Sequence, residues 1–291
     1  MRGFKAFLRG MRCRDKQYEE NTDYEENGGQ ICHSGMMHFC EDPLDVLQYY
    51  RLVDKNGYMI DLAEVEAPDD EVQRMNSKSA SRKLHVGSKL SLEKWIEEAV
   101  RVREDGKMSR YTDDGFEKDI LQEVSCLHGK FVATDLVDKV VACSGNNPHI
   151  GTLGGCSTIA TSGEYANIMA TGWESMIAST GDNSIIGALG GHSRVYAGGD
   201  DTRIVAAGSH SVVRATGKRS VVVNIGDEGY AAGELGDWIT LAEYKETWPS
   251  PERYVVCVRS AQIDGEVLKP GVLYTLKHEE FIEVSEMKHD Q

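Results

Sequence analysis

A glycine recurs every nine residues through the middle of the chain, and this spacing constrains the fold more than any other feature. Cut from Ser144, the sequence falls into ten nine-residue units, and all ten have glycine in second place, from Gly145 to Gly226. Nine of the ten have Ile or Val in seventh place, from Ile150 to Val222. Repetition at a fixed period without a slip in register is typical of a solenoid, in which each repeat stacks on the next.

The array begins before these ten units. CLHGKFVAT from Cys126 and DLVDKVVAC from Asp135 fit the same pattern with leucine in second place, which gives twelve units over 126–233. Within a unit, positions five, seven and nine are small, branched and small, as in Ser175, Ile177 and Ser179. Positions six and eight vary freely, so the pattern predicts a strand with one buried face.

The solenoid predicted here has four-residue turns between five-residue strands. The obligatory glycine indicates a backbone position with positive φ or with no room for a Cβ atom. Two units per coil give a flat, two-sheeted β-solenoid. Its six coils, spaced ~4.8 Å apart, make a rod about 25 to 30 Å long. Three units per coil is the alternative, but the small flanking residues favour the thinner form. The calcium-binding motif GGxGxDxUx is missing from the repeat, so no calcium is expected.

The segments on either side of the array have different patterns. Residues 1–105 predict an α+β domain, with helices in EDPLDVLQYY and SLEKWIEEAVRV, a strand in YMIDLAEVEA and a polar loop in DDEVQRMNSKSASRK. Residues 106–125 are expected to be a linker and lead-in. Residues 234–291 predict a small antiparallel β cap with strands in WITLAEY, YVVCVRSAQID, GVLYTLK and EFIEV. The fold class is therefore mainly β, with a solenoid between two smaller parts.

Charge and cysteine content limit the classes of partner and compartment. The net charge of −15 disfavours nucleic acid and anionic membranes, because both repel an acidic surface. No apolar run is long enough to span a bilayer, and the start of the chain lacks the pattern of a secretion signal. Seven widely spaced cysteines favour reduced thiols over a disulfide framework. We therefore expect a cytoplasmic protein.

Both ends of the chain resemble an uncharacterised family found in bacteriophages and in bacterial, prophage-type genes. The matching stretches are GFKAF at Gly3, CRDKQYEENTDYEE from Cys13, ICHSGMMHFCEDPLDVLQYY from Ile31, SGEYANIMA at Ser162, and the closing blocks GDWITLAEY and IDGEVLKPGVLYTLKHEEFIEV. They cover most of the chain except about 105–130. The resemblance implies a phage or prophage origin and a three-part architecture, and it supplies no activity.

One cluster of residues has the chemistry of a metal site. Cys13, Cys32, His38 and Cys40 match the family block residue by residue, and three thiolates with one imidazole would complete a tetrahedral zinc site. His38 and Cys40 are two residues apart, so on a strand they point to the same side. His33 is an alternative ligand. The competing interpretation is that these residues pack in the core of a small domain, since cysteine behaves as a small hydrophobe.

Two classes of function fit the sequence. The first is a non-enzymatic binding or assembly protein, with a host or phage protein as partner and the solenoid as a rigid surface. The second is an enzyme in the N-terminal domain, where Arg14, the segment Met37–Phe39, Glu64 and Glu66 follow the loose motif order of ADP-ribosyltransferase-type folds. No catalytic triad and no phosphate-binding loop is recognisable.

Association between copies of the chain is also left open by the sequence. The solenoid has strand edges through which copies can pair, and it has outward apolar residues such as Tyr196 and Val212.

Overall fold

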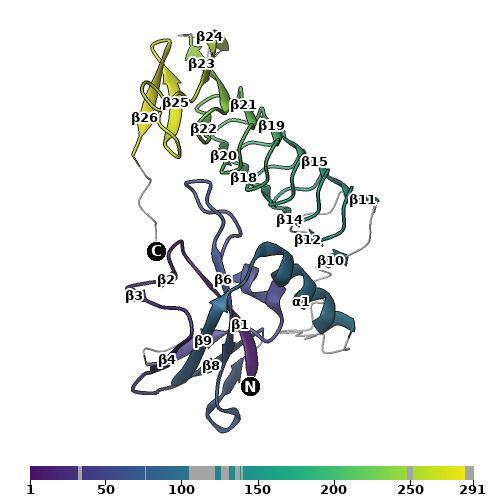
Figure 1. Cartoon of the computed structure of the whole chain (residues 1–291), viewed down its shortest axis with the longest axis vertical. Helices are drawn as coiled ribbons and strands as arrows, with labels where there is room; N and C mark the ends of the chain where they lie inside the picture. Colours follow the sequence, from purple (N-terminus) through teal and green to yellow (C-terminus); the bar gives the residue numbers. More distant parts are fainter. Residues whose placement is uncertain are drawn as a thin grey trace. The chain divides into compact units, whose positions relative to one another are not determined.

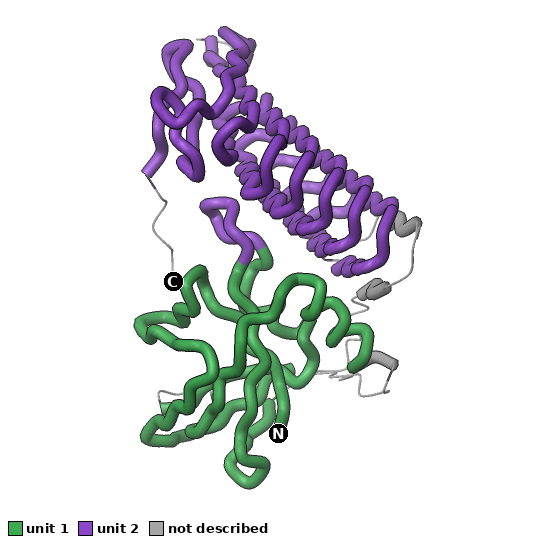
Figure 2. Tube along the Cα trace, in the orientation of Figure 1, with its two compact units in different colours: residues 1–52, 60–120, 291 green, residues 53–59, 121–290 purple. Residues whose placement is uncertain are grey.

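The structure is a computed structural model of the whole chain, and its strands divide into two compact units (Figures 1 and 2). It describes residues 1–31, 35–75, 77–104, 122–125, 131–134, 138, 140–247 and 252–285. Unit 1 contains residues 1–52 and 60–120, and unit 2 contains residues 53–59 and 121–290. The fold is mainly β, as the sequence predicts.

Unit 1 is built from two small antiparallel sheets and one α-helix. The larger sheet has the strand order β1-β6-β9-β4, with bounds Arg2–Phe7, Asp61–Glu66, Lys83–Lys89 and Thr22–Glu25. The smaller sheet has the order β5-β8-β7, with bounds Met37–Phe39, Lys78–Ser81 and Gln73–Met75. A hairpin of β2 (Arg12–Cys13) and β3 (Lys16–Gln17) and the helix α1 (Leu92–Glu104) complete it.

The helix predicted after Asp42 is present as a 3-10 helix, η1 (Pro43–Gln48), and the Asp42 side chain accepts from the Leu44 N–H as predicted. One local prediction for unit 1 is wrong, because the predicted polar loop contains β7 and β8, preceded by a short 3-10 turn η2 (Asp69–Glu71). All three side chains of β7 are exposed, so this strand has no alternating pattern that the sequence could show. The helix α1 and the strand β6 lie where predicted.

Backbone pairing joins the two sheets of unit 1 at one point. Phe4 of β1 exchanges hydrogen bonds with Cys40, at 2.7 and 2.8 Å. A Cβ atom at the neighbouring Gly3 would overlap the Phe39 ring and approach the Cys40 carbonyl to 2.8 Å. Glycine therefore allows the close approach of β1 to the segment 39–40, which explains the first residue of the GFKAF motif.

Unit 2 is a β-solenoid with two nine-residue units per coil, as the small flanking residues predict. From β10 to β23, alternate strands form two separate parallel ladders. Up to β22 each residue pairs with the residue 18 positions later, such as Ile159 with Ile177, and β21 pairs with β23 at a separation of 17. The nine-stranded sheet contains β10 (Gln122–Ser125), β12 (Val140–Cys143), β14 (Thr158–Thr161), β16 (Met176–Ser179), β18 (Arg194–Ala197), β20 (Val212–Ala215), β22 (Tyr230–Ala232), β25 (Leu273–Lys277) and β26 (Glu280–Val284). The eight-stranded sheet contains β11 (Phe131–Thr134), β13 (His149–Thr152), β15 (Asn167–Ala170), β17 (Ile185–Ala188), β19 (Arg203–Ala206), β21 (Val221–Asn224), β23 (Trp238–Glu246) and β24 (Arg253–Gln262).

The recurrent glycine is needed for space rather than for its dihedral angles. A Cβ atom at Gly181, for example, would overlap the carbonyl of Gly163 one coil below. Positive φ falls two residues later, at non-glycine residues such as Asn183 (58°) and His192 (57°). Of the two explanations that the sequence allows, the lack of room for a Cβ atom is therefore the correct one.

The interior of the solenoid is a column of branched side chains flanked by small ones. Seventh-position residues from Ile159 to Val222 are at most 3% exposed and form one continuous cluster. From Ser157 to Thr202, the buried fifth-position hydroxyls donate to the carbonyl of the glycine three residues earlier, as Ser175 does to Gly172 at 2.8 Å. This bond closes the turn and gives a buried polar group its partner, which is why serine or threonine fits the position.

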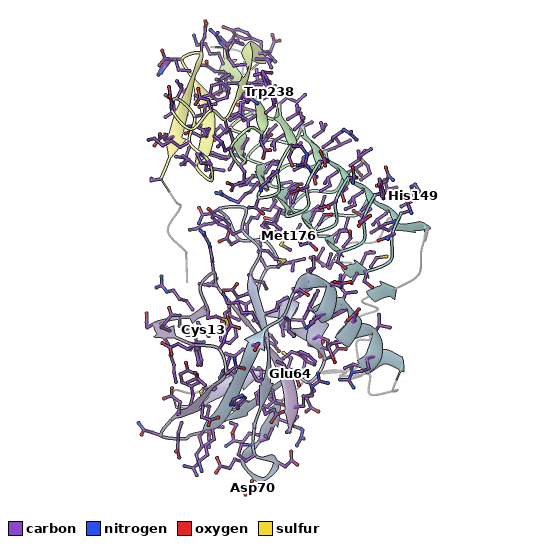
Figure 3. All side chains as sticks on the ribbon, in the orientation of Figure 1. Cys13, Glu64, Asp70, His149, Met176 and Trp238 are labelled. Carbon is purple, nitrogen blue, oxygen red and sulfur yellow. The ribbon has the colours of Figure 1, made fainter. Side chains whose placement is uncertain are left out.

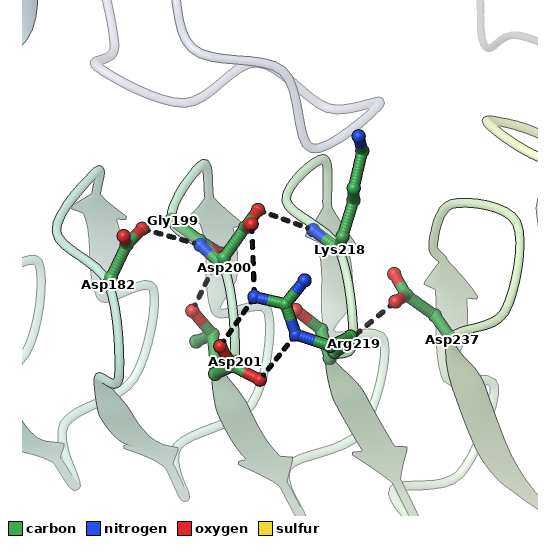
Figure 4. Close-up of polar contacts among 9 residues, drawn as sticks. Asp182, Gly199, Asp200, Asp201, Lys218, Arg219 and Asp237 are labelled. Atoms are coloured by element: carbon green, nitrogen blue, oxygen red, sulfur yellow. Dashed lines mark hydrogen bonds and ion pairs between the residues drawn. The ribbon is translucent and has the colours of Figure 1, made fainter.

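One row of turns carries a ladder of carboxylate-to-backbone hydrogen bonds (Figure 4). Asp182 accepts from the Asp200 N–H at 2.7 Å, and Asp200 accepts from the Lys218 N–H at 2.8 Å. Arg219 pairs with Asp201 at 2.7 Å and with Asp200 at 3.2 Å. These three aspartates of the repeat therefore bond to groups of neighbouring coils.

The C-terminal strands lie where the sequence predicts them, but they extend the two solenoid sheets. β24 adds antiparallel to β23, and β25 pairs with β22 and with β26. They cover the backbone groups of the last coil, which is the function expected of a cap. Within the described residues, no helix is long and apolar enough to cross a bilayer.

Candidate interaction surface

The outward side of the eight-stranded sheet is apolar and exposed to solvent. Eight large apolar side chains lie on it, each between 37% and 66% exposed. Five come from the strands β15 to β23 and three directly follow β13, β17 and β21, where the alternation continues outward: Met169, Ile185, Val205, Val221, Trp238, Leu153, Leu189 and Ile225. We call these eight residues the apolar face. Val258 of β24, paired with Ala242 of β23 and 53% exposed, extends it.

Charge is nearly absent from this surface. Among the outward positions of β13 to β21, all within the described part of the chain, Arg203 is the one Lys, Arg, Asp or Glu residue. The Met169 side chain lies over Gly187 of the next strand: its Sδ is 2.6 Å from the place that a Cβ atom there would take, so it covers this glycine with an apolar group. A contiguous, nearly uncharged apolar area of this kind marks an interaction surface.

The outward side of the nine-stranded sheet is different, because other segments of unit 2 cover it from β18 to β22. We call this side the covered face. From β14 to β22, all described, none of its outward side chains is exposed, and six of them are fully buried: Thr158, Ala160, Ala178, Val212, Arg214 and Ala232. In Figure 3, Met176 marks this side of the solenoid and His149 marks the outward side of the eight-stranded sheet.

Arg214 shows how the covered face is closed. Although it is an outward residue, its side chain is 1% exposed. Its Nε donates to the Asn56 carbonyl at 2.9 Å, its Nη1 donates to the Gly271 carbonyl at 2.7 Å, and its guanidinium lies 3.7 Å from the centre of the Tyr58 ring. The segment 53–59 belongs to unit 2 through contacts of this kind (Figure 2). A buried guanidinium with these partners is well satisfied.

Apolar packing from the C-terminal strands closes the rest of this end. Leu273 of β25 forms a buried cluster with Val212 and Ala232, and Tyr230 and Val284 pack against it. Val212 is 4% exposed and Tyr196 is half-buried, so neither residue is an open contact for another molecule. Of the two routes to association that the sequence leaves open, an apolar contact through Val212 is therefore closed by the chain's own packing.

The apolar face has a signal in the sequence, but only at a period of 18. In chain order the outward sixth positions look irregular: Asn167, Met176, Ile185, Arg194, Arg203, Val212. Every second one belongs to the same sheet. Read that way, the eight-stranded sheet has Asn, Ile, Arg, Val and Trp in this position and Met, Gly, Val and Val in the eighth. The nine-residue period mixes the two faces and hides the difference.

Three of the residues predicted as zinc ligands, Cys13, His38 and Cys40, lie around a buried lysine in unit 1. Lys5 of β1 is 5% exposed, and its Nζ donates to the His38 carbonyl at 2.7 Å. Burial lowers the pKa of Lys5, and the nearby thiols of Cys13 and Cys40 act in the opposite direction. Cys13 also contacts the Tyr50 hydroxyl at 3.0 Å. Cys32 and the alternative ligand His33 lie outside the described residues.

The protonation of this cluster follows from its burial. Desolvation, with the charges of Lys5, Lys78 and Arg14, lowers the pKa of His38 to about 4, and burial raises the pKa of Cys40. Among the described residues, no group of three or more His, Cys, Asp or Glu side chains is placed to hold a metal ion. Structural zinc stays a prediction, and metal analysis of the purified chain and of Cys40→Ser would test it: one zinc per chain, lost in the variant, is the result it requires.

The acidic residues of the enzymatic alternative line a shallow hollow of about 240 Å³ on β6 and β9. Glu64 and Glu66 share this hollow with His85, Lys89 and Lys94. Glu64 is already ion-paired with Arg2, which also contacts Glu98 at 3.1 Å. Arg14 lies in the turn between β2 and β3 and is not among the lining residues. The hollow is therefore bordered by side chains of both charges, and Arg14 does not join Glu64 and Glu66 there.

Comparison with known proteins identifies one part of the chain. Residues 1–98 match a family model described as a domain of unknown function, DUF7666. No curated protein and no solved structure matches the chain. The match covers most of unit 1 but not the solenoid, and its description gives no activity.

Proposed function

We propose that this chain is a non-enzymatic binding or assembly protein of the phage or prophage type, with the solenoid as a rigid scaffold. Its partner is a host or phage protein in the host cytoplasm, and the apolar face is where that partner binds. A β-solenoid scaffold fits a non-catalytic role. The phage origin rests on the resemblance of the two ends of the chain to a phage and prophage family.

The observation that carries the proposal is the difference between the two outward sides of the solenoid. The chain covers one side with its own segments and leaves eight large apolar side chains exposed on the other. Exposing that much apolar surface has a cost in solubility, which a binding surface explains. The hollow beside Glu66 has mixed charges and no comparable apolar lining, so it supports the enzymatic alternative less well.

A capture experiment with the full chain tests this function. The immobilised chain is incubated with lysate of a bacterial host, and bound proteins are identified by mass spectrometry. We expect specific capture that is lost in Ile185→Lys and kept in Tyr165→Lys. Tyr165 is the matched control because it is equally exposed, at 49%, but lies in a turn outside the apolar face. Capture that survives Ile185→Lys would contradict the proposal, and so would a wild-type chain that specifically binds neither another protein nor a second copy of itself.

A further inference from the structure

We propose that the apolar face binds a second copy of this chain, so that the protein is a dimer of solenoids packed sheet to sheet. This inference rests on the proposed function, since it names the partner of the same surface. Three properties of the face favour a second copy over an unrelated protein: its area, its charge and its spacing.

The area is that of a stable interface. The eight residues of the apolar face together with Val258 leave 37% to 66% of their side chains exposed. For large apolar side chains this amounts to on the order of 800 Å² per copy, the area that each partner of a standard protein interface buries. No small set of large side chains supplies this area, because the exposed apolar surface is spread along five coils. A small ligand would leave most of this area in water.

The charge distribution removes the main obstacle to self-association. The chain has a net charge of −15, so two copies repel each other over most of their surfaces. From β13 to β21, within the described residues, the outward positions of the eight-stranded sheet hold no carboxylate and one cation, Arg203. The carboxylates of Asp200 and Asp201, in the turn that precedes β19, are already paired with Arg219 of the next coil. The face therefore meets a facing copy with little charge of either sign, so the repulsion between two acidic chains is weakest there.

The spacing of the rows matches in a second copy without adjustment. Adjacent strands of the sheet are in register at 18 residues per coil, which sets the outward rows ~4.8 Å apart. A facing copy has rows with the same spacing, so a match at one coil is repeated along the face. Sheets packed face to face through such apolar side chains lie ~10 Å apart. A twofold arrangement uses the same patch on both copies and closes without forming filaments.

Sedimentation or light scattering of the full chain over a range of concentrations tests this inference. We expect a mass of twice the 32.2 kDa chain at micromolar concentration and an unfolding temperature that rises with concentration. The double variant Ile185→Lys with Val205→Lys should weaken dimerisation about 100-fold or more, because it buries unpaired ammonium groups. Tyr165→Lys should leave the dimer unchanged.

Circular dichroism distinguishes a loss of dimerisation in the double variant from a loss of folding. Ile185 and Val205 are 49% and 43% exposed, so the circular dichroism of the double variant should match that of the wild type. A monomeric wild type, or a dimer that persists in the double variant, would overturn the inference. A monomer that captures another protein through Ile185 would overturn the second copy but keep the proposed function. A monomer that captures nothing would contradict both.

Discussion

The two outward sides of the solenoid are built from the same repeat and have opposite relations to solvent. On the nine-stranded sheet, outward residues as large as Arg214 are fully buried by the segment 53–59 and by the loop at Gly271. On the eight-stranded sheet, outward residues as apolar as Leu153 are 66% exposed. The inward positions are equivalent on the two sides, so the repeated residues determine how the coils stack. The outward positions determine what each side of the solenoid binds.

This comparison separates the residues that hold the stack from those that distinguish the two faces. Second-position glycines, fifth-position hydroxyls and seventh-position Ile and Val occur on both sides and should matter equally on both. Sixth-position and eighth-position residues differ between the sides, and their substitution should affect stability on the covered face and binding on the apolar face. The predictions below test that division.

The largest loss of stability is expected at a second-position glycine, because the coils that carry both faces stack through these glycines. In Gly190→Ala the new Cβ atom would overlap the Gly172 carbonyl of the coil below, so we expect a loss of about 3 kcal/mol or more in the free energy of unfolding. The adjacent Gly191→Ala is the matched control, because its Cβ atom would have no neighbour closer than 3.4 Å. Chemical denaturation of the full chain measures both. Equal stability of the two variants would contradict the stacking of glycines.

Substitution of two outward arginines, Arg214 on the covered face and Arg203 on the apolar face, compares the stability that each face contributes. Arg214→Ala removes two hydrogen bonds and the contact with Tyr58 from the covered face, and it should cost about 2 to 4 kcal/mol of unfolding free energy. Arg203→Ala removes the same side chain from the apolar face, where it is exposed, and should change stability by less than about 0.5 kcal/mol. Thermal unfolding of both variants, at a concentration where each is monomeric, gives the difference. Similar losses would mean that the two sides are equally covered.

A pair of valines separates the interior from the apolar face. Val213 points inward and is 0% exposed, so Val213→Ala should cost about 2 kcal/mol of unfolding free energy through lost burial and a cavity. Val205 points outward and is 43% exposed, so Val205→Ala should cost less than about 0.5 kcal/mol in the monomer. Denaturant titration distinguishes the two. A larger cost for Val205→Ala would invert the assigned directions of the side chains.

The smallest effect is expected at the turn hydroxyls. Ser193 donates to the Gly190 carbonyl at 2.7 Å, so Ser193→Ala should cost about 1 kcal/mol of unfolding free energy. Ser220 occupies the equivalent position, but within the described residues its buried hydroxyl has no partner. Ser220→Ala should therefore be neutral or slightly stabilising, because it removes an unsatisfied polar group. The same denaturation experiment measures both, and a larger loss in Ser220→Ala would show that the turn bond is not the cause.

The repeat made the solenoid predictable because one requirement recurs at every coil. Each second-position glycine, such as Gly181, allows the same close approach to the carbonyl of the coil below. Each seventh-position residue, such as Ile177, fills the same interior column. The covered face was not predictable, since the residues that bury Arg214 come from positions 56, 58 and 271, far away in the sequence. In unit 1, β7 has three exposed side chains, and without an alternating pattern its sequence resembles a loop.

The candidate surface is hidden in the sequence for a different reason. When the sequence is aligned at its nine-residue period, Ile185 falls on Arg194 and Val221 on Val212, so residues of the two sheets are superimposed. The structure shows that 18 residues separate neighbours within one sheet. A pattern of outward residues can be recognised only after the number of units per coil is known, and that number depends on packing in the interior.

The separation of the two faces by alternate units is the central claim, and engineered disulfides test it most directly. Residues 185 and 203 are 18 apart and paired on neighbouring strands of one sheet, whereas residues 185 and 194 are nine apart and lie on different sheets. Neighbouring strands ~4.8 Å apart place paired residues within disulfide range. The account predicts that Ile185→Cys with Arg203→Cys forms an intramolecular cross-link under mild oxidation, detected by peptide mass spectrometry, and that Ile185→Cys with Arg194→Cys does not. A cross-link in the second pair and none in the first would contradict it.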